Sequence, residues 1–121
     1  MDDLKQLAIT AANGNTVAAD WLLCMVEALH LWDDLIDRDK PVLDAKINRV
    51  FTKILCEMPR NPFYQANCAN LTPVLIAAIQ NWHVANAAER GELGALPPEA
   101  AFVVRSSYVD LVTIVATICG G

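Results

Sequence analysis

The chain has 121 residues, the length of one compact domain that can bury its own core without disulfides or metals. Hydrophobic residues make up 55% of it, and the net charge is −5 with nine scattered Lys and Arg residues. This balance excludes a basic nucleic-acid surface and a Lys/Arg-rich membrane-binding stretch, so we expect neither partner. We expect residues 1–121 to form a single domain that associates with copies of itself, because its apolar content and mean hydropathy of +0.31 are high.

The cysteines and the N-terminus indicate a cytoplasmic protein. The four cysteines form no Cys-x-x-Cys pair and are expected to be free thiols: Cys24, Cys56, Cys68 and Cys119. The acidic start at residues 1–5 lacks the apolar region of a signal peptide. The most apolar stretch, residues 100–119, contains Arg105 and Asp110, which disfavour a membrane span.

Helical periodicity runs through the chain, and no alternating strand pattern competes with it. A short first helix is expected from about residue 2 to the turn at Asn13-Gly14. Asn15 or Thr16 should cap a second helix that runs to about Asp37. The expected buried face of this helix has helical spacing: Trp21, Leu22, Met25, Ala28, Leu29, Trp32, Leu35 and Ile36.

Three further helices are predicted in the second part of the chain. The third covers residues 41–58, and the Asn- and Pro-rich segment 61–70 should be the main loop. The fourth covers residues 71–90, with Pro73 in its first turn, and the fifth residues 97–118. The pattern predicts an all-α fold, a compact bundle of four longer helices plus a short N-terminal one. Because the chain stops just after its most apolar helix, we expect either a longer protein or a partner at that end.

Four aspartates crowd the end of the second predicted helix, in a seven-residue run that begins at Asp33. Three of them, Asp33, Asp34 and Asp37 (the aspartate cluster), fall within an arc of about 100° that also contains His30. Like charges repel there and oppose the helix dipole, so either water screens them or a cation binds them. Carboxylates one turn apart are suitable ligands for Mg²⁺, which bridges to phosphates. A solvated face, with Arg38 paired to Asp34, remains the other interpretation.

The run from His30 to residue 39 resembles the D-D-x-x-D motif of isoprenoid synthases, the prenyltransferases and terpene cyclases. The resemblance implies an all-α bundle, here a reduced one, with the motif near the C-terminal end of a helix. It also implies that Asp33, Asp34 and Asp37 bind Mg²⁺ ions that hold and ionise a diphosphate, with His30 as a ligand-facing neighbour.

The second motif of the cyclases, N-D-x-x-S-x-x-x-E, is matched here in spacing only. Asn81 and Glu89 stand in its first and last positions, but Trp82 replaces the acid and Ala85 replaces the hydroxyl residue. The resemblance makes Asn81 and Glu89 candidate ligand-facing residues. Arg105, beside a polar stripe of the fifth predicted helix, is a further candidate for a phosphate contact, unless that stripe is a polar seam between helices.

A second resemblance covers more of the chain. Residues 32–37, 59–64 and 105–111 together resemble small proteins encoded by phages and prophages, a family that implies no particular activity. We therefore favour a small helical binding or interaction protein that is phage-derived and oligomeric. The alternative is a Mg²⁺-dependent enzyme, or an enzyme relic, that binds a small-molecule diphosphate through the aspartate cluster.

Overall fold

A computed structural model describes residues 2–38, 41–91 and 109–120 of the chain. These residues form α-helices joined by a short π-helix, a 3-10 turn and loops, without a strand, which confirms the predicted all-α class. In the described ranges no helix is long and apolar enough to cross a membrane. The first part of the expected fifth helix, with Arg105, lies outside the described residues.

The first two helices follow the local signals in the sequence. α1 (Asp2–Ala11) ends at a turn in which Asn13 and Gly14 both have positive φ, 53° and 82°. Asn and Gly adopt this left-handed backbone conformation more readily than other residues, whose side chains would be strained in it. α2 (Thr16–Asp37) begins where the Asn15 side chain accepts a 3.1 Å hydrogen bond from the backbone N–H three residues later. The predicted bounds of both helices are confirmed.

The third helix is shorter and less regular than predicted. α3 (Asp44–Thr52) begins three residues after Pro41 and then widens into a π-helix, η1 (Lys53–Glu57), in which Met58 N–H bonds to Lys53 O. A single 3-10 turn, η2 (Met58–Arg60), ends this segment. A π-helical turn contains one more residue than an α-helical turn. The side chains after it therefore point in a different direction from those of a continuous α-helix.

The prediction of a loop at residues 61–70 is wrong, because α4 (Pro62–Glu89) begins at its second residue. Asn61 is the N-cap: its side chain accepts from Tyr64 N–H at 3.1 Å, and a proline at the first helical position needs no hydrogen bond. The Asn and Pro residues that suggested a loop are thus a helix start. Pro73 consequently lies inside a long helix rather than in its first turn.

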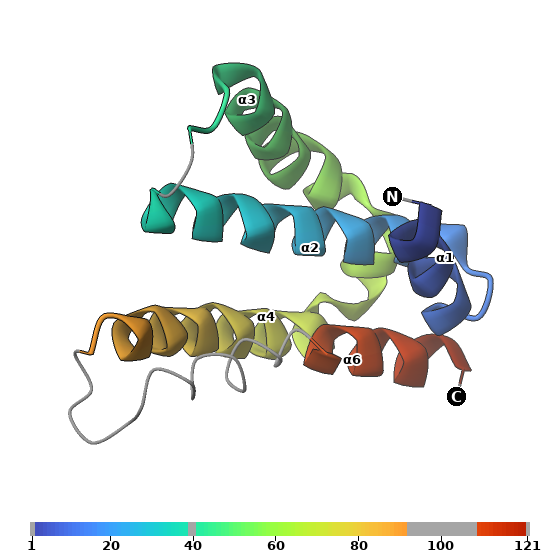
Figure 1. Cartoon of the computed structure of the whole chain (residues 1–121). Coiled ribbons are helices and arrows are strands. Elements are labelled where there is room, and N and C mark those ends of the chain that lie inside the picture. The colour runs from blue at the N-terminus through green and yellow to red at the C-terminus, as the bar shows by residue number, and fades with distance from the viewer. Residues whose placement is uncertain (1, 39–40, 92–108, 121) are drawn as a thin grey trace.

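The helices meet around one core (Figure 1). α2 and α4 run in the same direction, and α3 lies on the opposite side of α2 from α4. α1 and α6 (Val109–Gly120) pack against each other and against α2 at the end of the molecule where both termini lie. The largest fully buried side chains are Trp21, Leu71, Leu111, Val50 and Val115.

The apolar face predicted for α2 is buried only over the first part of the helix. Trp21 and Leu29 are buried, and the Trp21 ring stacks on Tyr64 of α4 with centroids 6.3 Å apart. Leu35 and Ile36, in the last turn, are exposed. The described helices therefore leave the end of α2 uncovered, a result that periodicity alone did not indicate.

Replacing Asn61 with Ala should lower the free energy of unfolding by about 1 kcal/mol or more, because the first turn of α4 loses its cap and the Val17 carbonyl loses the 3.0 Å hydrogen bond that the Asn61 amide donates. Asn70→Ala is the matched control. Asn70 is an exposed residue inside α4, so this change should be neutral or slightly stabilising, since Ala is the better helix former. Urea denaturation followed by circular dichroism measures the free energy of unfolding of both variants. Equal effects of the two substitutions would contradict a helix start at Asn61.

Candidate functional site

The structure places the aspartate cluster on a side of α2 that is only partly covered. Asp33 and Asp34 are half-buried, whereas Asp37 and His30 are exposed. The His30 ring lies against Trp82 of α4, with centroids 6.4 Å apart. The shared helical arc is therefore correct, but its members have unequal access to solvent.

Asp34 already has a cationic neighbour on another helix. Lys46 Nζ of α3 lies 3.8 Å from its Oδ2 atom. Arg38 contacts Asp34 through its backbone. Arg38 is the C-cap of α2, with a left-handed backbone at φ 57°, and its N–H donates to the Asp34 carbonyl oxygen. Within the described ranges no three His, Cys, Asp or Glu residues are grouped to hold a metal ion. A Mg²⁺ site at the aspartate cluster stays a prediction.

The other candidate residues are dispersed. Asn81 is half-buried in α4, and Glu89 is exposed at the end of that helix. Arg105 falls outside the described residues. On α6, Thr113 and Thr117 donate to the carbonyl oxygens four residues earlier, at 3.0 and 2.9 Å. These two hydroxyls of the polar stripe are satisfied by their own helix, which favours a local role for them.

The principal polar contact between helices centres on Glu27, which is not among the candidate site residues predicted from the sequence. Its Oε1 accepts from Arg49 Nη2 at 3.0 Å, and its Oε2 accepts from Lys53 Nζ at 2.9 Å. Arg49 comes from α3, and Lys53 is the first residue of the π-helix. The available signal was the helical spacing of Lys46, Arg49 and Lys53, which places three cations on one side of this segment.

The Glu27 carboxylate is held in its ionised form. Burial by itself would raise its pKa, but the hydrogen bonds from Lys53 and Arg49 outweigh burial and hold the pKa below its usual value. Nearby, burial raises the pKa of the Cys24 thiol, with Lys53 acting in the opposite direction. Cys24 is therefore a protonated, weakly nucleophilic thiol at neutral pH.

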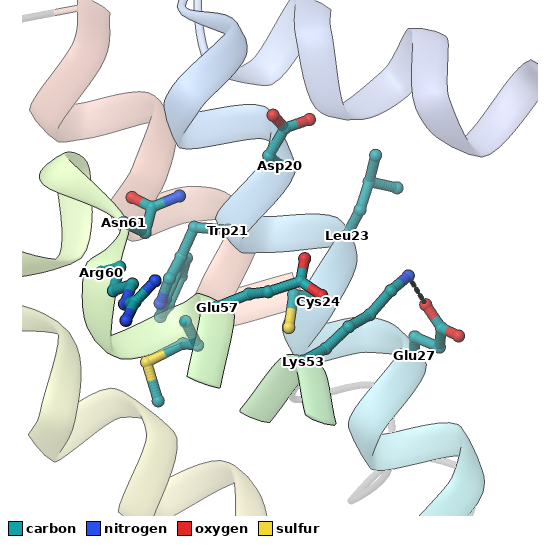
Figure 2. A pocket seen from close by; sticks show the side chains of 10 residues that line it. Asp20, Trp21, Leu23, Cys24, Glu27, Lys53, Glu57, Arg60 and Asn61 are labelled. Atoms are coloured by element: carbon teal, nitrogen blue, oxygen red, sulfur yellow. Dashed lines mark hydrogen bonds and ion pairs between the residues drawn. The ribbon is translucent and has the colours of Figure 1, made fainter. Parts of the chain in front are cut away.

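A hollow of about 500 Å³ lies between α2 and the η1–η2 segment, next to this ion pair (Figure 2). Figure 2 shows Lys53 reaching across from η1 to Glu27 on α2. Trp21 forms part of the wall and is 1% exposed, and its Nε1–H has no acceptor among the described residues. A buried donor without an acceptor costs about 1–3 kcal/mol.

The chain matches no family model, no curated protein and no solved structure. The resemblances to isoprenoid synthases and to phage-encoded proteins therefore remain predictions from sequence motifs. Function has to be inferred from the geometry of α2, α3 and the side chains between them.

Glu27→Gln should lower the free energy of unfolding by about 1 kcal/mol at pH 7, because it removes a charge shared by two cations. The folded pKa of Glu27 lies below the unfolded value of about 4.3. Its stabilisation is therefore complete above the unfolded pKa and is lost as the pH falls through the folded pKa. The difference between wild type and variant should shrink in acid.

Urea denaturation between pH 7 and pH 3 measures this difference. Glu57→Gln is the control, because Glu57 is an exposed glutamate with no ion pair among the described residues. A wild-type advantage over Glu27→Gln that stays constant across this pH range would contradict the assignment.

Proposed function

We propose that the chain is a small helical interaction protein that associates with a second copy of itself through the outer face of α3. This face is defined by Leu43, Phe51 and Leu55, which are 75%, 48% and 69% exposed. The single observation that supports the proposal is an orientation in which Phe51 and Leu55 stay exposed, although Val50, on the same helical segment, is buried and the cations of that segment contact acids of α2.

The orientation follows from helical geometry. At 100° per residue, Lys46, Arg49 and Lys53 lie roughly 160–220° around the helix from Phe51. The three cations contact acids of α2 at 3.8, 3.0 and 2.9 Å. Phe51 must therefore point away from α2. Val50 covers the core side of the same helix, so Phe51 is an apolar side chain that the core leaves uncovered.

The apolar outer face favours a partner because burying it releases about 25 cal/mol per Å² of apolar surface. Large exposed apolar side chains on one face are typical of interaction sites. Leu35 and Ile36, in the last turn of α2, are further apolar side chains exposed to solvent. A hydrophobic interface of this kind fits the high apolar content of the chain.

A second copy of the chain suits this face on grounds of charge. The protein carries a net charge of −5, so two copies repel each other at long range. Residues 44–57 hold three cations and two acids, and the cations contact acids of α2, so this segment adds little net charge to a contact through the outer face of α3. A two-fold axis at α3 would pair the same face from both copies.

The Mg²⁺-dependent diphosphate enzyme predicted as the alternative gains no support from the geometry. Its proposed ligand Asp34 is engaged by Lys46, and Asp37 is exposed to solvent. Phage origin likewise stays a prediction, drawn from short segments of sequence. We therefore retain the interaction protein as the proposed function.

The variant Phe51→Glu/Leu55→Glu should be monomeric where the wild type is a dimer, because two carboxylates would be buried against each other. Leu7→Glu is the matched control: Leu7 is 52% exposed on α1, far along the chain from α3, and its variant should remain dimeric. Sedimentation equilibrium measures the mass, and circular dichroism confirms that each variant is folded. A monomeric wild type at micromolar concentration would overturn the proposal.

A further inference from the structure

A second hollow, of about 490 Å³, lies on the other side of the Glu27–Lys53 pair, between α1, α2 and α3. We call it the basic hollow. Four of the nine Lys and Arg residues of the chain line it, but only one of the fourteen acids. The cations come from two separate segments: Lys5 on α1, and Lys46, Arg49 and Lys53 on α3 and η1. The fold thus gathers cations that are scattered along the sequence.

The acids nearby do not balance these cations. Glu27 is shared by Arg49 and Lys53, and Asp34 lies beside Lys46. Lys5 makes no ion pair with a described residue. Four positive charges in the lining therefore have two acids within ion-pair distance among the described residues. In a concave site with apolar walls, such an excess focuses a positive potential that attracts anions, even in a protein whose net charge is negative.

We propose that the basic hollow binds an organic phosphate or diphosphate directly through these cations, without a metal ion. Phosphate oxygens accept several charge-assisted hydrogen bonds at once, and Lys and Arg are the side chains that supply them. Arg49 uses one of its guanidinium nitrogens for Glu27, which leaves further N–H donors for an anion.

The apolar part of the wall indicates an ester rather than a free phosphate ion. Leu4, Leu23 and Val26 line the same hollow. Its volume lies within the range of about 300–1,000 Å³ that is common for small-molecule sites. His30 is exposed and also lines it, as a further donor to the anion. A phosphate ester with a compact apolar group fits this site, because the phosphate can contact the cations while the apolar group contacts the apolar wall.

This site is distinct from the outer face of α3 and from the aspartate cluster, and one substitution separates it from a metal site. If Mg²⁺ at Asp34 held the phosphate, Asp34→Asn would abolish binding. If Lys46 contacts the phosphate directly, Asp34→Asn removes the competing carboxylate and binding should stay equal or become tighter.

Titration calorimetry with phenyl phosphate and with inorganic pyrophosphate, in buffer containing EDTA, tests the proposal on the intact protein. We expect binding of both, weakened by added salt. Lys5→Gln should weaken it about threefold or more, and Lys5→Gln/Lys46→Gln about tenfold or more. Arg60→Gln is the charge-matched control, because Arg60 lines the first hollow and not the basic hollow, and it should change binding less than twofold.

Several results would overturn the proposal: no binding without Mg²⁺, loss of binding in Asp34→Asn, or equal weakening by Lys5→Gln and Arg60→Gln. Benzoate binding as tightly as phenyl phosphate would also overturn it, because the site would then select any aromatic anion. The Phe51→Glu/Leu55→Glu variant should still bind phenyl phosphate. Failure of self-association and failure of phosphate binding are therefore distinguishable.

Discussion

The contact of Glu27 with Arg49 and Lys53, together with the burial of Val50, determines how α3 sits on α2. Two cations hold one carboxylate at 3.0 and 2.9 Å, so the charged side of α3 is directed toward α2. Charge-assisted hydrogen bonds of this kind are directional, and they fix the rotation of one helix against another. The π-helical turn that begins at Lys53 belongs to the same arrangement, since it supplies one of the two cations.

Two surfaces follow from that single rotation. The inward side collects Lys46, Arg49 and Lys53 around a hollow that also receives Lys5 from α1. The outward side leaves Phe51 and Leu55 in solvent. The ion pairs, beside the buried Val50, explain why the basic hollow and the apolar outer face lie on opposite sides of one short helix.

Local signals predicted some elements well and others poorly, for identifiable reasons. The Asn13-Gly14 turn and the Asn15 cap determined the start of α2, because these residues act through their own backbone. At residues 61–70 the same residue types led to a wrong prediction of a loop, because Asn and Pro are common both in loops and at helix starts. Asn61 could be recognised as a cap only once its bond to Tyr64 was known.

The sequence by itself determined the helical class, the ends of α1 and α2, and the shared arc of Asp33, Asp34 and Asp37. Each of these depends on residues close together in the chain. Only the tertiary structure decided that Lys46 lies beside Asp34 and that Glu27 joins α2 to α3. Those outcomes depend on the rotation and crossing of two helices, which bring together residues 12 to 26 positions apart along the chain, and helical periodicity carries no information about them.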